Sequence, residues 1–238
     1  MVSTIDNALH RSRLFQLLAL GFAHPVDAFH HTLVDGSYPR AIGATATVAG
    51  YDVQELSAPQ LQSMDFEAGY IELFQLGRRG KPLVSLNAGD YTALNEDEAS
   101  RPEFLLRYSD WYRHFGLRTD TSEDANELPD HLVCQLEFLA WVAHLEAEAG
   151  EDGDARRGYQ RAQRDFLQRH LKPFLALLVE KLPQIQDSPV SDFFGELTAQ
   201  ADTITRAIQG QLETITNGDS PMTNAEDSDQ IAAVNLWG

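Results

Sequence analysis

The amino-acid sequence predicts an all-α protein, with a single-domain helical bundle over residues 1–216 and an acidic tail over residues 217–238. Apolar residues recur every three or four positions through most of the chain, which is the period of an amphipathic helix. No segment alternates apolar and polar residues as a half-buried strand does, and no fixed-period repeat is present. With 238 residues, 43% of them hydrophobic and 23% charged, the chain can bury a core without a disulfide or a metal ion.

The first part of the chain is expected to hold two helices and a loop. A helical stripe opens the chain and ends before Pro25, and it comprises Leu9, Leu14, Leu17, Leu18 and Phe22. A short helix is expected over residues 26–34. The segment 36–56 contains three glycines and a proline, so it reads as a loop with at most one weak helix.

A further helix and a long loop follow. Ser57 and Pro59 are typical of a helix N-terminus, and Gly77 with Gly80 should end that helix. Its apolar residues are Leu61, Met64, Ala68, Ile71, Leu73 and Phe74. Residues 77–95 contain turn formers without a helical or a strand period, which predicts a long ordered loop. Loops of this length in compact domains are usually functional or mobile.

Two helices are expected in the next part of the chain. The first should be capped by Gly116, and its aromatic face comprises Phe104, Leu105, Tyr108, Trp111, Tyr112 and Phe115. An acidic, polar linker covers residues 117–129. The second helix should begin at Pro129 and Asp130 and continue to Gly150.

The last part of the bundle is expected to be helical with one interruption. An apolar stripe that includes Tyr159 and Phe166 predicts a helix that Pro173 must break or kink. The final helix follows Ser188 and keeps its apolar stripe to Ile215. The tail that follows has the composition of a disordered segment.

Charge and cysteine content restrict the classes of function. The chain has 36 acidic and 18 basic residues, a net charge of −18, which repels nucleic acids and anionic lipid and favours a cationic partner. The single cysteine, Cys134, excludes an internal disulfide framework and a cysteine-ligated zinc or iron–sulfur site. No apolar run is long enough for a membrane helix and no signal peptide is recognisable, so we expect a cytoplasmic protein without stable membrane insertion.

Signatures of catalysis and of cofactor binding are absent. The sequence has no phosphate-binding loop, dinucleotide fingerprint, zinc-protease helix or serine-hydrolase elbow, and we expect no cofactor. The densest histidine group is His24 with His30 and His31. Neighbouring positions on a helix point in different directions, so this group is a poor metal site.

Two local patterns remain as candidate binding residues. In the first, Glu127 and Pro129 precede Asp130 and His131 at the start of a predicted helix. Asp130 suits a helix N-cap, and the helix dipole disfavours a charged His131 in the first turn, so a purely structural cap also explains this pattern. The second pattern, Tyr70 to Phe74 followed by Pro82, lies at the edge of the predicted loop, where a groove could hold an amphipathic helix or an extended apolar peptide.

Taken in order, the chain's motifs resemble those of the TorD/DmsD/NarJ family of redox-enzyme maturation chaperones. The motifs are Tyr-x-x-Leu-Phe, Gly-x-x-Gly-x-Pro, Glu-x-Pro-Asp-His-Leu, Leu-Glu-Phe-Leu and Phe-x-x-x-His-Leu, and the resemblance covers roughly residues 10 to 215. Within the family, the sequence is most similar to chaperones of type II molybdoenzymes of the DMSO-reductase family. These serve nitrate, selenate and chlorate reductases and dimethyl sulfide and ethylbenzene dehydrogenases.

The resemblance implies an all-α, TorD-like cytoplasmic protein that is not an enzyme. It would bind the molybdenum-containing catalytic subunit of its client, often through the twin-arginine leader, until the molybdenum cofactor is inserted before export. The client-binding residues carried over by the resemblance are Tyr70, Leu73, Phe74, Pro82, Glu127, Asp130 and His131. Some relatives have an aromatic residue after the loop proline, whereas this chain has Leu83.

Two other functions are open at this point. One is a helical metal-dependent hydrolase that uses Asp130, His131 and a nearby glutamate. The other is a general helical adaptor whose acidity reflects only a saline cytoplasm. The sequence also leaves open whether the protein is a monomer or a dimer.

Overall fold

The computed structural model describes residues 4–77, 80–95, 99–117, 127–185 and 188–217. Within these ranges the protein is helical, apart from connecting segments and one isolated antiparallel bridge between Asn87 and His131. The predicted all-α class is therefore confirmed. The α-helices are α1 (Thr4–Phe22), α2 (Asp27–Val34), α3 (Ser37–Val48), α4 (Ser63–Tyr70), α5 (Arg101–His114), α6 (Leu132–Glu148), α7 (Gly153–Phe166), α8 (Lys172–Lys181) and α9 (Pro189–Ile215).

Short helical turns continue or connect several of these helices. The π-helical turn Ile71–Gln75 extends α4, and a second one, Leu167–Leu171, joins α7 to α8. Three 3-10 turns lie at Ala88–Asp90, Thr92–Leu94 and Leu182–Gln184. The first two lie within the described residues 80–95, a part of the predicted loop.

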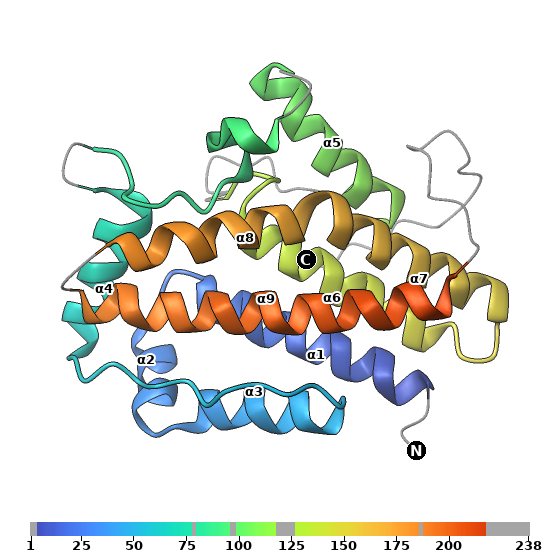
Figure 1. Ribbon diagram of the computed structural model, residues 1–238, viewed down its shortest axis with the longest axis horizontal. Helices are drawn as coiled ribbons and strands as arrows, with labels where there is room; N and C mark the ends of the chain where they lie inside the picture. The colour runs from blue at the N-terminus through green and yellow to red at the C-terminus, as the bar shows by residue number, and fades with distance from the viewer. Residues whose placement is uncertain (1–3, 78–79, 96–98, 118–126, 186–187, 218–238) are drawn as a thin grey trace.

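The helices form an elongated bundle in which α9 follows the long axis (Figure 1). Helix α1 packs most extensively against α6, and α9 lies against α7, α8 and α1. Helix α3 lies beside α1, and α2 packs against α3 and α4. Helix α4 lies at one end of the bundle, and α5 is at the top of the view. In the part of the chain that the structure describes, no helix is both long enough and apolar enough to cross a bilayer.

Two groups of aromatic side chains fill opposite parts of one continuous core. Near α4, the rings of Phe74 and Phe194 meet edge to face with their centroids 4.8 Å apart. Where α6 meets the C-terminal end of α7, the ring centroids of Phe138 and Phe166 lie 4.6 Å apart. Such pairs add to the stabilisation from burial, so α4 is held against α9 and α6 against α7.

The prediction of a loop over residues 36–56 is wrong for most of that segment, because residues 37–48 form the helix α3. Gly36 and Gly50 adopt left-handed φ values of 74° and 81° and follow the ends of α2 and α3. Both glycines therefore terminate helices rather than mark a continuous loop. Tyr38, Ile42 and Ala46 lie one helical turn apart and are buried, so core packing stabilises α3.

Two details of the other predicted helices also differ. The helix expected from Ser57 begins at Ser63, and the residues between them have no regular secondary structure. One contact made there is between the Ser57 amide and the Glu196 carboxylate at 3.0 Å. Leu9, which belongs to the apolar stripe of the first helix, is 45% exposed. The predicted position of the stripe is right for its other members, which are buried.

Pro173 interrupts the α-helical pattern without ending the helical rod. It occupies the first turn of α8, directly after the π-helical turn Leu167–Leu171. Proline has no amide hydrogen to donate to the preceding turn, and a change of helical type is a known way of accommodating such a gap. The final helix begins as predicted, with the Ser188 side chain accepting a hydrogen bond from the Ser191 amide. The predicted tail lies outside the described residues from residue 218 on.

Candidate functional site

The side chains of Tyr70, Leu73 and Phe74 are buried where α4 passes into its π-helical turn. The Tyr70 hydroxyl donates a hydrogen bond to the Phe22 carbonyl oxygen at 2.9 Å. Burial, with a smaller contribution from the nearby Glu127 carboxylate, raises the pKa of Tyr70. These three residues therefore fix the shape of this end of the bundle.

The loop over 80–95 is attached to the bundle on two sides. On one side, the Val84 amide donates to the Leu73 carbonyl oxygen at 3.0 Å. On the other, the Leu132 amide donates to the Leu86 carbonyl oxygen at 2.8 Å, and the Ala88 amide donates to the Asp130 carbonyl oxygen at 3.2 Å. The loop thus joins the end of α4 to the start of α6.

Asp130 lies at the centre of this attachment. Its carboxylate accepts a hydrogen bond from the Gly89 amide at 2.7 Å and pairs with the Arg101 guanidinium of α5 at 3.0 Å. The side chain is 0% exposed, and burial raises its pKa, whereas the Gly89 amide and Arg101 act in the opposite direction. Asp130 therefore connects the loop, α5 and the N-terminal end of α6.

The predicted roles of Asp130 and His131 at the start of α6 are corrected by this geometry. The N-cap is His131, whose Nδ1 accepts a hydrogen bond from the Val133 amide at 3.3 Å. Asp130 stands one position earlier and uses its carboxylate for the loop and for α5 instead. Burial lowers the pKa of His131 to about 4, so the ring is neutral at pH 7 and can act as an acceptor.

The accessible part of this region is an edge of mixed apolar and acidic character. Glu127 is exposed and Pro82 is half-buried. Three leucines, next to Pro82 and Glu127 in the chain or at the end of the π-helical turn, expose 65%, 41% and 44% of their surface, namely Leu76, Leu83 and Leu128. We call these five side chains the loop-edge surface. The sequence pattern does not identify Leu76 and Leu128, because nothing in helical spacing distinguishes an exposed leucine from a core leucine.

The acidic residues of this region are partly withdrawn from water. Burial raises the pKa of Glu127, and the nearby His24 acts in the opposite direction. For Glu137, burial and then the proximity of Glu127 raise the pKa. Two carboxylates in this situation are stabilised in their charged form by a cation placed beside them. The edge therefore combines apolar contact area with a preference for a positive charge.

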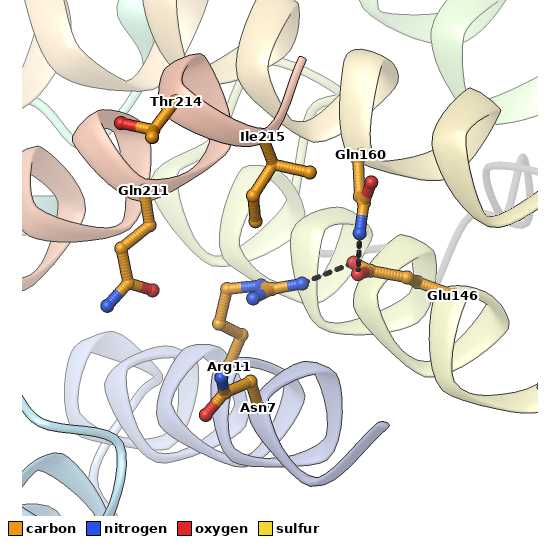
Figure 2. Close-up of a pocket in the computed structure, with 7 residues that line it drawn as sticks. All are labelled: Asn7, Arg11, Glu146, Gln160, Gln211, Thr214 and Ile215. Carbon is orange, nitrogen blue, oxygen red and sulfur yellow. Dashed lines mark hydrogen bonds and ion pairs between the residues drawn. The ribbon is translucent and has the colours of Figure 1, made fainter. Parts of the chain in front are cut away.

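A pocket of about 300 Å3 lies at the other end of α6 (Figure 2). It is lined by residues of α1, α6, α7 and α9, including Arg11, Glu146 and Gln160. Arg11 is ion-paired with Glu146, which also accepts a hydrogen bond from the Gln160 side chain at 2.7 Å. The charges in the pocket thus neutralise each other, and this pocket has neither the residues nor the position of the predicted site.

A metal site is not found among the residues that the structure describes, since no group of three His, Cys, Asp or Glu side chains could hold an ion. The histidines that are close in sequence have separate partners. His24 pairs with Glu67 at 3.0 Å, and His30 contacts the Leu61 carbonyl oxygen at 3.0 Å. His31 is 80% exposed and lies 3.9 Å from Asp35. These three histidines therefore contact different parts of the chain.

Comparison with known proteins identifies the family. Residues 39–180 match the model of the nitrate reductase delta subunit family. The chain belongs to this family. It is 37% identical over 244 residues to the dimethyl sulfide dehydrogenase assembly chaperone protein of Rhodovulum sulfidophilum. The alignment covers 99% of this chain and 96% of that protein. The resemblance predicted from the ordered motifs is thus confirmed.

Further relatives carry names of the same kind. The perchlorate reductase assembly chaperone protein of Dechloromonas aromatica is 31% identical over 90% of this chain and 93% of its own length. The selenate reductase assembly chaperone protein of Thauera selenatis is 40% identical over 49% of this chain and 57% of its own length. No solved structure matches the chain significantly. The names of these relatives all describe assembly chaperones.

Proposed function

We propose that this protein is an assembly chaperone for the molybdenum-containing catalytic subunit of a DMSO-reductase-family oxidoreductase. The observation that carries the proposal is the 37% identity, over 99% of the chain, to a dimethyl sulfide dehydrogenase assembly chaperone. In this role the protein acts in the cytoplasm, does not turn over a substrate and binds its client only until the client is mature.

We further propose that the client binds at the loop-edge surface through its twin-arginine leader. Such a leader combines a pair of arginines with an apolar stretch. The surface offers the matching groups, namely the carboxylate of Glu127 and the exposed side chains of Leu83 and Leu128. The net charge of −18 accelerates the approach of a cationic segment, and apolar burial then supplies most of the affinity.

The residues carried over from the family divide into two groups under this proposal. Pro82 and Glu127 are accessible and contact the client directly. The other five are buried and shape the surface from beneath, namely Tyr70, Leu73, Phe74, Asp130 and His131. Because a chaperone must release its client, we expect a dissociation constant on the order of micromolar, about −8 kcal/mol.

The test is a titration of the purified protein with the molybdenum catalytic subunits encoded in the same genome, each with and without its leader. One subunit should bind, and removing its leader should weaken binding at least about tenfold. Equal affinity without the leader would refute the leader contact while leaving the chaperone proposal intact. Failure of every catalytic subunit to bind would refute the chaperone proposal, and binding of many unrelated proteins would favour a general adaptor.

Matched variants locate the contact. Leu128→Ser should weaken binding, whereas Leu9→Ser, at a leucine of almost the same exposure on α1, should not; the two residues are 44% and 45% exposed. Glu127→Gln should slow association, whereas Glu151→Gln should not, because Glu151 follows the far end of α6. That helix has 17 residues and is therefore about 25 Å long. Equal effects within either pair would remove the loop-edge surface as the binding site.

A further inference from the structure

We infer that Asp130 is a positioning residue: its carboxylate locks the 80–95 loop to α5 and thereby sets the shape of the loop-edge surface. This inference rests on the proposed function, since it concerns the surface to which the client binds. It assigns Asp130 an indirect role, although the family motif points to Asp130 as part of the binding region.

Burial argues against a direct contact between Asp130 and a client. The Asp130 side chain is 0% exposed. Its oxygen atoms are engaged by the Gly89 amide at 2.7 Å and by the Arg101 guanidinium at 3.0 Å. A ligand would have to displace both partners, whose hydrogen bonds to a charged group are stronger than ordinary ones.

The contact leaves no room for a side chain at position 89 while Arg101 keeps its present position. A Cβ atom added to Gly89 would lie 1.5 Å from Nη1 of Arg101 and 3.0 Å from the Asp130 carboxylate. The loop backbone therefore approaches the ion pair directly. Arg101 also lies 3.7 Å from the carboxylate of Asp90, so Asp130 and Arg101 together hold two consecutive residues of the loop.

The constraint at Gly89 extends along the loop to the accessible surface. The Ser85 hydroxyl donates to the Asp90 carboxylate at 2.5 Å, and the Tyr91 hydroxyl donates to the Ser85 carbonyl oxygen at 2.8 Å. The Val84 amide donates a hydrogen bond to the Leu73 carbonyl oxygen, and Pro82 and Leu83 come directly before Val84 in the chain. Fixing Gly89 thus fixes the base of the segment that presents Leu83 to solvent.

The first test is Asp130→Asn. An asparagine oxygen in the place of Oδ2 can still accept from Gly89 and from Nη1 of Arg101, but the ion pair loses its negative charge, and the asparagine amide group then faces Nη2 of Arg101, donor against donor. We expect unchanged helix content, faster hydrogen exchange at the Gly89 and Ala88 amides, and client affinity about tenfold weaker. Arg101→Gln should have the same effects. Arg113→Gln, on the same helix but at a residue that is 70% exposed, should have none of them.

A disulfide separates positioning from direct contact. Asn87 and His131 stand opposite each other in the antiparallel bridge, and the backbone hydrogen bonds of the bridge are made by the residues on either side of them. Residues in such a non-hydrogen-bonded pair have a Cα separation of about 4.5 Å, which suits a disulfide. In a Cys134→Ser background, Asn87→Cys with His131→Cys therefore ties the loop to α6 covalently. The oxidised protein with these three substitutions and with Asp130 intact gives the reference affinity for the client.

With Asp130→Asn added, the oxidised protein should regain the reference affinity, and reduction should weaken binding about tenfold again. Weak binding in the oxidised state would overturn the inference, as would unchanged affinity in Asp130→Asn alone. Hydrogen exchange requires no client, so unchanged exchange at Gly89 would overturn the lock even if the proposed function fails. Absence of client binding by the unmodified protein would overturn the proposed function instead.

Discussion

Replacing Glu146 by leucine would remove the central acceptor of the buried network between α1, α6 and α7. Glu146 is 1% exposed and pairs with Arg11, which is 2% exposed. It also accepts hydrogen bonds from the side chains of Gln160 and Gln163, both at 2.7 Å. The substitution thus leaves a guanidinium almost out of contact with water and without its counter-ion.

The expected cost follows from this burial. Breaking a buried ion pair by removing one partner typically destabilises a protein by about 3–5 kcal/mol. Replacing Arg11 by methionine in the same chain removes the uncompensated charge, so only the two glutamines lose a partner, at about 1–3 kcal/mol in all. The adjoining pocket of about 300 Å3, which Gln160 lines, has room for water to hydrate that glutamine, and this favours the lower value. The double variant should therefore be more stable than Glu146→Leu alone.

Urea denaturation measures these free energies, followed in parallel by far-UV circular dichroism and tryptophan fluorescence. Coincident transitions would support a two-state treatment. Leu9→Ala, at an exposed residue of α1, is the control and should change stability by less than about 0.5 kcal/mol. A cost below about 1 kcal/mol for Glu146→Leu, or strictly additive effects of the two substitutions, would refute the interpretation of the network as a coupled buried pair.

Three further predictions concern pH, packing and salt. The neutral form of the buried His131, whose pKa is about 4 against an ordinary 6.5, stabilises the fold above pH 6.5, and this stabilisation is lost as the pH falls toward 4. Between pH 6.5 and 5, the free energy of unfolding should therefore fall by about 2 kcal/mol less in His131→Asn than in the unmodified protein. The same pH dependence of unfolding in both proteins would contradict this. Gly77→Ala should lower the free energy of unfolding by about 1–3 kcal/mol in thermal denaturation, because its Cβ would lie 2.1 Å from the Lys81 carbonyl oxygen. Gly158→Ala, whose Cβ would meet no atom within 4 Å, should not lower it. Stopped-flow measurements should show slower client association as salt rises to about 0.5 M, and a constant rate would remove the role of charge.

Much of the fold is predictable from sequence because its helices are amphipathic. The apolar stripes of α1, α5, α6 and α9 appear directly as a period of three or four residues. The stripe of α3 does not, because Pro39 and Gly43 within the helix and the glycines that flank it give the composition of a loop. Only tertiary packing of Tyr38, Ile42 and Ala46 shows that Gly36 and Gly50 mark the ends of helices.

The candidate site is less predictable, because it depends on contacts between distant residues. The ordered motifs identify the right region and its family, but the helix-cap prediction for Asp130 considers only local geometry. The decisive partners of Asp130 are Gly89, 41 residues away, and Arg101, 29 residues away. In the same way, the exposure of Leu76 and Leu128 depends on where the loop lies and not on their spacing.

Molybdenum content of the client tests the chaperone role most directly. The catalytic subunit that binds this protein is produced in cells with and without the chain, purified, and analysed for molybdenum per subunit. We predict a severalfold loss of molybdenum without the chain, restored by the unmodified protein and by Leu9→Ser but less by Leu128→Ser. Equal molybdenum content with and without the chain would contradict the account.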